Sequence, residues 1–160
     1  MEYASFLVGE HLFGIPVLLV QEISKPLRLF PVPGHDPKVA GLVSLRGRTA
    51  VALDVRRFLL DDDAAAAPPK SRKFYVLETE ESLSREAREL GLEAHGETIV
   101  LIVDEAQGIL DGEKLEFHPP PAHVREEYID GVMKSESRLM TLISVPRLVK
   151  DLMVHQEESP

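Results

Sequence analysis

The sequence predicts an all-β fold of the barrel or sandwich type. Short apolar segments recur along the chain, and residues typical of turns separate them. The segment Arg48 to Arg56 alternates with the period of a strand: Thr49, Val51, Leu53 and Val55 share one face, and Arg48, Ala50, Ala52, Asp54 and Arg56 share the other. A chain of 160 residues has the length of one domain and can bury a full core without disulfides.

The chain begins with a predicted hairpin. Tyr3–Val8 and Leu12–Val17 are strand-like, and the Gly9-Glu10 pair between them suits a type II′ turn, because glycine accepts a positive φ at the first position. Pro16 lacks a backbone donor, so the second strand should lie at a sheet edge or stop pairing there. The next segment, Val17–Ile23, fits either a strand or one helical turn.

The middle of the chain alternates between breaks and strands. Leu29–Asp36 contains two prolines and a glycine, which exclude a central strand or a helix. Asp61–Lys73, rich in acids, alanine and proline, is predicted as a linker, and Phe74–Glu78 as a strand. Thr98–Asp104 is continuously apolar, which is typical of a strand buried on both faces.

Glu81–Leu90 is predicted as a surface helix. Leu83, Ala87 and Leu90 recur at i, i+4 and i+7 and would share one face. The pairs Glu81/Arg85 and Arg85/Glu89 have the spacing of weak helical ion pairs. Gly91 follows where a helix commonly ends in the left-handed conformation.

The C-terminal third again predicts strands and turns, followed by a short helix. The expected elements are turns at Asp111-Gly112 and Asp130-Gly131, strands at Lys114–His118 and Arg138–Ser144, a terminal helix at Val145–Val154, and an acidic tail at 156–160.

Composition excludes several classes of protein. Eighteen Lys and Arg against 27 Asp and Glu give a net charge of −9, which argues against a large phosphate-binding surface and hence against nucleic acid as a partner. Apolar runs such as Ile99–Val103 are far shorter than the ~20 residues of a membrane span, so no membrane insertion is expected. The Met1-Glu2-Tyr3 start lacks the features of a secretory signal, and we therefore expect a soluble cytoplasmic protein.

Charge is distributed unevenly along the chain. Residues 1–60 hold seven basic and five acidic side chains, a net charge of +2, whereas the remainder holds eleven and twenty-two, a net charge of −11. Four of the early cations, Arg46, Arg48, Arg56 and Arg57, fall within twelve residues. They are either a solvated strand face or a surface that steers association with an acidic protein partner.

No motif indicates catalysis, a metal or a cofactor. The sequence contains no cysteine, no phosphate-binding glycine loop, no HExxH motif and no nucleophile elbow. His118 and His123 are separated by three prolines, and Asp61-Asp62-Asp63 lacks the spacing of a calcium loop. Two alternatives to a protein-binding scaffold stay open: an enzyme with a dispersed site, and a small barrel that binds nucleic acid or peptides, with few aromatic platforms for single strands.

One segment is more specific than these patterns. Gly41-Leu42-Val43-Ser44-Leu45-Arg46-Gly47, followed by the Thr49–Val55 strand, resembles the signature of the CheW family of chemotaxis coupling proteins. The order and spacing of further segments add to the resemblance: Gly9-Glu10, Phe13-Gly14-Ile15, Val20-Gln21-Glu22-Ile23, Pro31-Val32-Pro33-Gly34, Val103-Asp104, Gly108-Ile109-Leu110, Tyr128-Ile129-Asp130-Gly131 and Leu142-Ile143-Ser144-Val145.

The chain departs from the family pattern at two places. Val51 stands where the family usually has a proline after Leu-Arg-Gly, a change that a strand accepts. The stretch from about 80 to 96 looks like an insertion that carries the charged helix.

The resemblance implies an architecture and a role. The fold would be two five-stranded SH3-like β-barrel subdomains packed around a shared core, with a short C-terminal helix and one inserted surface helix, all in a single domain over residues 1–155. Members are non-catalytic, cofactor-free adaptors that couple the cytoplasmic hairpin of a methyl-accepting chemoreceptor to the regulatory domain of the histidine kinase CheA. Receptor helices would occupy an apolar groove between the barrels, and kinase contacts would lie on one barrel end. The protein would be cytoplasmic and recruited to membrane-associated receptor arrays. The alternative is a module that binds another protein in a non-flagellar chemosensory pathway without receptor coupling.

The same resemblance yields nine candidate protein-binding residues: Val20, Glu22, Ile23, Val43, Leu45, Arg46, Gly47, Asp54 and Arg56. Apolar anchors beside charges of both signs are what a helix-in-groove or barrel-to-barrel contact uses. Each candidate also has a structural interpretation. The four apolar residues could be core, and Glu22 and Arg46 could form an ion pair that holds a loop. Gly47 could serve a turn, and Asp54 could bind Arg56 or a turn amide.

Overall fold

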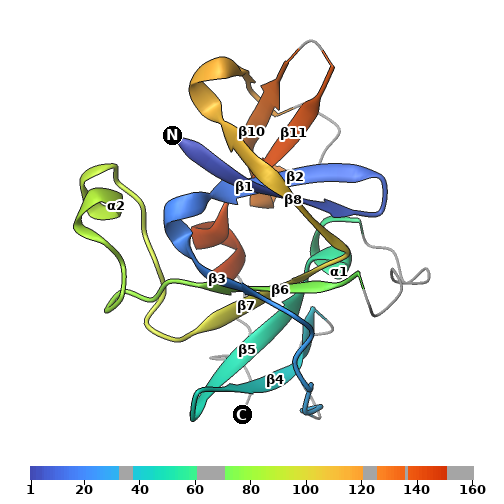
Figure 1. Ribbon diagram of the computed structural model, residues 1–160, viewed down its shortest axis with the longest axis vertical. Helices are drawn as coiled ribbons and strands as arrows, with labels where there is room; N and C mark the ends of the chain where they lie inside the picture. The colour runs from blue at the N-terminus through green and yellow to red at the C-terminus, as the bar shows by residue number, and fades with distance from the viewer. Residues whose placement is uncertain (33–37, 61–70, 121–125, 136, 151–160) are drawn as a thin grey trace.

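The computed structural model describes residues 1–32, 38–60, 71–120, 126–135 and 137–150, which form two β-sheets (Figure 1). The first has six strands in the order β8-β1-β2-β11-β10-β9. Their bounds are β1 Glu2–Val8, β2 His11–Pro16, β8 Glu105–Asp111, β9 Glu116–His118, β10 Ile129–Lys134 and β11 Leu139–Ile143.

The second sheet has five strands in the order β3-β6-β7-β5-β4. They are β3 Val20–Ser24, β4 Val39–Leu45, β5 Arg48–Asp54, β6 Lys73–Leu77 and β7 Ile99–Val103. The chain thus leaves the first sheet after β2, builds the whole second sheet, and returns through β8. The expected all-β fold of two subdomains is confirmed, although the first sheet has one strand more than the family resemblance implied.

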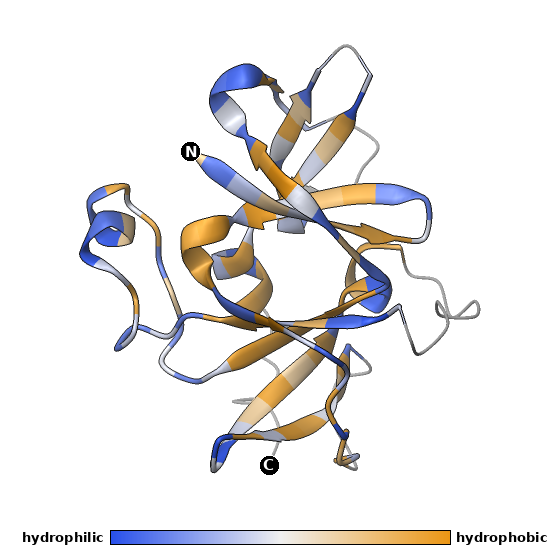
Figure 2. Ribbon diagram, viewed as in Figure 1, coloured by the Kyte–Doolittle hydropathy of each residue, from blue (hydrophilic) through white to orange (hydrophobic). Residues whose placement is uncertain are grey.

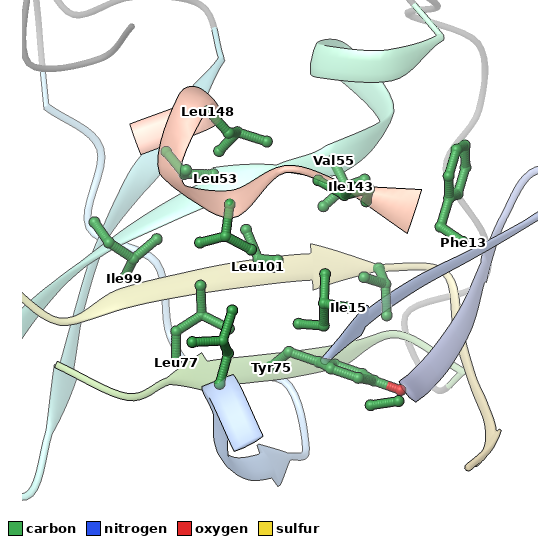
Figure 3. Packing of buried hydrophobic residues seen from close by; sticks show 14 of the residues in the cluster. Phe13, Ile15, Leu53, Val55, Tyr75, Leu77, Ile99, Leu101, Ile143 and Leu148 are labelled. Atoms are coloured by element: carbon green, nitrogen blue, oxygen red, sulfur yellow. The ribbon is translucent and has the colours of Figure 1, made fainter. Parts of the chain in front are cut away.

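The buried apolar residues that the structure describes form three clusters. Val43, Phe74, Val76 and Val100 belong to a cluster on one face of the second sheet, and Met133, Met140 and Leu142 to one on the first. The largest cluster takes residues from both sheets and lies between them. Figure 3 shows Ile15 of β2 near Tyr75 and Leu101 of the second sheet, with Phe13 at one side of the cluster and Leu148 of the C-terminal helix at the other.

This arrangement explains why β7 has no polar face. Ile99, Leu101 and Val103 point into the cluster between the sheets, whereas Val100 and Ile102 point into the cluster of the second sheet. All five residues are buried. The strand was expected to be covered on both faces, and this expectation is confirmed.

The N-terminal hairpin forms as predicted. β1 pairs with β2 from Tyr3↔Pro16 to Val8↔His11, and Gly9 has a φ of +61°, while Glu10 does not enter the positive-φ region, as a type II′ turn requires. β2 is an inner strand, yet β11 pairs with it at Phe13 and Gly14 and not at Pro16. The strand ends at Pro16, so the expectation that pairing stops at this proline is correct, and the expectation of an edge strand is not. The ambiguous segment resolves into a 3-10 turn, Val17–Leu19, followed by β3.

The predicted helix over Glu81–Leu90 is wrong in its extent. The helix α2 spans Arg85–Glu89, because Ser84 caps it by accepting a hydrogen bond from the backbone N–H of Ala87 at 3.1 Å. Leu83 precedes the helix and is buried with Ala87, whereas Leu90 is 52% exposed. The Arg85–Glu89 ion pair is present at 3.2 Å, and Gly91 has the expected positive φ of +80°.

Two other expectations need correction. The alternating strand ends at Asp54, and Val55–Leu59 form the short helix α1, so Arg56 lies on a helix. Asp130-Gly131 is not a turn but part of β10, where the register with β11 shifts. A side chain at Gly131 would meet the ring of Phe117 at 2.3 Å and the carbonyl of His118 at 2.8 Å, so glycine here serves close packing.

The remaining expected elements are present with small differences in bounds. The C-terminal helix is helical from Val145 to Lys150, and Asp111 leads into a 3-10 turn, Gly112–Lys114, before β9. Most of the linker, the end of the C-terminal helix, the acidic tail, Asp61-Asp62-Asp63 and His123 lie outside the described residues. Within the described residues, no helix has both the length and the apolar character of a membrane span.

Candidate functional site

The β4–β5 hairpin turns through Arg46-Gly47 and carries the centre of the candidate site. Leu45 pairs with Arg48 across the turn. Arg46 has a φ of +51° and Gly47 a φ of +79°, the signs that a two-residue type I′ turn requires. Glycine adopts this conformation freely, but arginine adopts it rarely. The hairpin tip is strongly hydrophilic (Figure 2), and the Arg46 side chain is 68% exposed.

Glu22 and Arg46 form an ion pair between the two edge strands of the second sheet. The Nη2 atom of Arg46 donates to Oε2 of Glu22 at 2.9 Å. Glu22 belongs to β3 and Arg46 follows β4, and these strands are opposite edges of the sheet. The sheet must therefore curl until its edges approach each other, and an antiparallel bridge between Phe30 and Leu42 extends this closure. The other carboxylate oxygen of Glu22, Oε1, is buried without a hydrogen bond to any described residue.

The four apolar candidates differ in exposure. Val43 is buried inside the second sheet, and Leu45 packs against the same cluster. Val20 packs against the cluster between the sheets. Ile23, at 47% exposed, is the one candidate with a large apolar surface toward solvent. Core packing therefore accounts for Val43, while Ile23 is available for a contact.

Asp54 and Arg56 lie at the opposite end of β5 from the turn. Asp54 caps α1: its Oδ1 accepts from the backbone N–H of Arg56 at 3.1 Å, and its Oδ2 lies 3.5 Å from Nε of Arg57. Nη2 of Arg56 lies 2.5 Å from Oδ2 of Asp104, with side chains 11% and 13% exposed. Asp104 also accepts from the backbone N–H of Gly9 at 2.7 Å. These contacts join the two sheets, and the structure does not bring Asp54 or Arg56 to the Glu22–Arg46 pair.

A groove of about 430 Å³ lies between the first sheet and the end of α1. His11, Phe13, Ile129 and Leu139 line it from the first sheet, and Leu59 and Leu60 from the end of α1, which follows β5 of the second sheet. None of the nine candidate residues is among those that line it. The sequence analysis missed these residues individually, although an apolar pair at the end of a predicted strand, such as Leu59-Leu60, is a weak signal of such a surface.

The described residues offer no metal site. They contain no group of three or more His, Asp or Glu side chains placed to hold an ion. His118 belongs to β9, with its Nε2 3.7 Å from Oε1 of Glu116. The chemistry available at the site is therefore that of ion pairs and apolar contacts on a surface.

Comparison with known proteins places this geometry in a family. The CheW-like domain profile matches residues 2–153, nearly the whole chain. The chain belongs to the CheW-like domain family. The chemotaxis protein CheW of Bacillus subtilis (strain 168) is 26% identical over 141 residues, which cover 86% of this chain and 80% of that protein.

A solved structure has the same fold. The scaffolding protein TtCheW from Thermoanaerobacter tengcongensis superposes with a TM-score of 0.71 over 90% of this chain and 88% of its own, at 18% sequence identity. The CheW-like signature at Gly41–Gly47 forms β4 and the turn that carries Arg46. The family resemblance drawn from the sequence is thus confirmed.

Proposed function

We propose that this CheW-like protein is a non-catalytic adaptor of bacterial chemosensory signalling, which couples the cytoplasmic tips of chemoreceptors to the histidine kinase CheA. Family membership and the chemotaxis relative support a role in chemotaxis, and the scaffolding relative supports an adaptor rather than an enzyme. The protein would act in the cytoplasm, recruited to receptor arrays at the membrane.

The observation that carries the proposal is the conformation of Arg46. An arginine at a positive φ costs about 1–2 kcal/mol relative to an ordinary backbone, and this turn position would suit glycine or asparagine better. The side chain is solvent-exposed, and its ion pair with Glu22 contributes about 0–1 kcal/mol at such exposure. The folded chain gains little from Arg46, which is expected where a residue serves a partner.

The two surfaces suit two partners. The groove between the first sheet and α1 is lined by Phe13, Leu59, Leu60 and Leu139 and would accept an apolar helix face, as the receptor hairpin requires. The Glu22–Arg46 pair offers a second, charged surface at the edges of the second sheet, and the exposed Ile23 adds apolar area on the same edge strand, β3. Their separation would let one molecule hold two proteins at once.

The test is a charge-reversal cycle at Glu22 and Arg46. Glu22→Arg and Arg46→Glu each place two like charges side by side, and the double reversal restores an opposite pair. We expect the double variant to recover much of the loss in unfolding free energy, through a coupling of about 0.5 kcal/mol, the low end of the range for contacting residues, because the pair is exposed. We expect it to recover assembly with receptor and kinase incompletely.

The measurements are unfolding midpoints for the four proteins and a receptor–kinase pull-down with each. Full binding of both partners by every variant would remove Glu22 and Arg46 from the proposed interface. Kinase binding without receptor binding by the unmodified protein would favour the alternative adaptor, one that serves another chemosensory pathway without receptor coupling.

A further inference from the structure

A polar cleft, separate from the apolar groove, lies beside the β4–β5 turn, and the inserted segment 80–96 helps to form it. The cleft has a volume of about 400 Å³. Arg46 and Arg48 line it from the hairpin, and Thr79, Glu81 and Ser82 line it from the start of the insertion. Two segments more than thirty residues apart in sequence therefore face one another across this cleft.

The wall that the insertion contributes is held in place by several hydrogen bonds. Thr79 and Ser82 bond reciprocally: the N–H of Thr79 donates to Oγ of Ser82 at 2.9 Å, and the N–H of Ser82 to Oγ1 of Thr79 at 3.2 Å. Thr79 also forms a parallel bridge with His95, so the two ends of the insertion are tied together. The Arg88 guanidinium donates to the carbonyl oxygens of Glu80 and Leu83. A wall fixed in this way loses little conformational entropy when a partner binds.

Apolar side chains of the insertion also attach it to the core. Leu83 and Ala87 are buried in the cluster between the sheets, and Leu92 and Ala94 pack against that cluster. The position of the wall relative to the hairpin is therefore set by the core of the molecule.

Both arginines of the cleft are exposed, and Arg48 is the less committed of the two. Its side chain is exposed, and it forms no ion pair with any of the residues that the structure describes. Arg46 has one guanidinium nitrogen committed to Glu22. Glu81 stands across the cleft as the one acid among the lining residues. A guanidinium binds a carboxylate through two parallel hydrogen bonds, which gives both affinity and orientation.

We propose that this cleft receives a carboxylate side chain of the protein partner, bound by Arg48, and that the inserted wall determines which partner side chains fit. This inference rests on the proposed adaptor function and adds a contact in which the insertion takes part. A carboxylate of a protein suits the cleft better than a phosphate, because Glu81 would repel the second negative charge of a phosphate.

The experiment compares binding kinetics of full-length variants with the receptor–kinase assembly. Arg48→Glu and the milder Arg48→Gln are compared with Arg138→Glu, which makes the same change in net charge as Arg48→Glu at an exposed position in the connection between β10 and β11. We expect Arg48→Glu to weaken binding tenfold or more and Arg48→Gln roughly threefold to fivefold, while Arg138→Glu stays within about twofold of the unmodified protein. Unfolding midpoints of all three variants should match the unmodified chain, because Arg48 and Arg138 are exposed.

Glu81→Gln should change the binding affinity in the opposite direction to Arg48→Glu. Removing the acid that faces Arg48 should strengthen binding of an acidic partner side chain about twofold, mainly through faster association. Unchanged binding by Arg48→Glu, or an equal loss in Arg138→Glu, would overturn the proposed contact while leaving the adaptor role intact. Failure of the unmodified chain to bind receptor and kinase would instead overturn the adaptor role.

Discussion

Two glycines of the Gly41–Gly47 signature look equivalent in the sequence, but the structure requires each of them for a different physical reason. Gly47 lies in open space, and only its φ of +79° calls for glycine. Gly41 has a φ of +153°, and a Cβ there would also lie 2.7 Å from the carbonyl oxygen of Phe30. That carbonyl accepts from the N–H of Leu42, so it cannot move without breaking the bridge to β4. Two glycines of one signature thus carry different constraints.

This difference predicts unequal effects of alanine. Gly47→Ala should lower the free energy of unfolding by about 1 kcal/mol, the cost of a left-handed backbone for a residue with a Cβ. Gly41→Ala should cost more, about 2–4 kcal/mol, because the backbone contact adds to the strain. Urea unfolding of both variants measures the two losses, and equal losses would mean that the Phe30 carbonyl yields to the added methyl group.

At the scale of elements, the segment 80–96, which carries α2, is more deeply integrated than its charged composition suggests. The pattern predicted a surface helix over Glu81–Leu90, which would contribute little to the core. Instead, the turn before α2 buries Leu83, and α2 buries Ala87 against the cluster between the sheets. Replacing the insertion with a short Gly-Ser turn would therefore remove core residues as well as a loop, and we expect a large loss of stability rather than the small cost of loop length.

Point variants of two leucines test this integration. Leu83→Ala should lower the free energy of unfolding by about 2–3 kcal/mol, as truncation of a buried leucine does. Leu90→Ala is the matched control: its side chain is 52% exposed, and the change should stay within about 0.5 kcal/mol. Thermal or urea unfolding gives both values. A loss below 1 kcal/mol for Leu83→Ala would show that the segment 80–96 is a surface loop that contributes little to the core.

At the scale of the whole molecule, the two sheets are joined by polar bonds as well as by apolar packing. The Tyr75 hydroxyl of β6 donates to the carbonyl of Ser5 in β1 at 3.2 Å. The Arg56–Asp104 pair connects α1 to the residue after β7, and Asp104 accepts from Gly9 in the β1–β2 turn. The Tyr75–Ser5 hydrogen bond and the contacts of Asp104 with Arg56 and Gly9 thus add polar links to the apolar packing that Figure 3 shows.

Burial raises the pKa of Tyr75 to about 12, above the ordinary value of 10.0. Since the folded protein holds the phenol proton more tightly than the unfolded chain does, this contribution to stability is complete below pH 10 and is lost as the pH rises through about 12. Tyr75→Phe should lose about 1 kcal/mol at neutral pH, the value of one hydrogen bond, and should lack the Tyr75 part of the alkaline decline. Unfolding midpoints between pH 8 and 12 for both proteins measure this difference, and parallel curves would contradict it.

Charge steering by the hairpin is also a property of the whole molecule. Arg46 and Arg48 are exposed on a chain of net charge −9, whereas the guanidinium of Arg56 is committed to Asp104. If the kinase is the partner proposed above, raising salt above physiological strength should therefore slow association with it more than it speeds dissociation. Stopped-flow or surface-binding kinetics at several salt concentrations test this, and an association rate independent of salt would exclude steering. Arg46→Gln should flatten the salt dependence.

The sequence by itself determined the features that depend on neighbouring residues and on periodicity. These include the Gly9-Glu10 hairpin, the strand β7 with two buried faces, the positive φ of Gly47, and membership of the CheW-like family. A turn or a strand pattern is a property of a few consecutive residues, so it can be read locally.

Tertiary structure alone decided which surfaces meet. It placed Leu83 and Ala87 in the core, committed Arg56 to Asp104, packed Phe117 over Gly131, and assembled the apolar groove from β2, β10, β11 and α1. Each of these contacts joins segments that pack against each other only after the sheets have formed and faced one another. Local periodicity carries no information about which distant segments will pack against each other. The proposed surfaces depend on that packing.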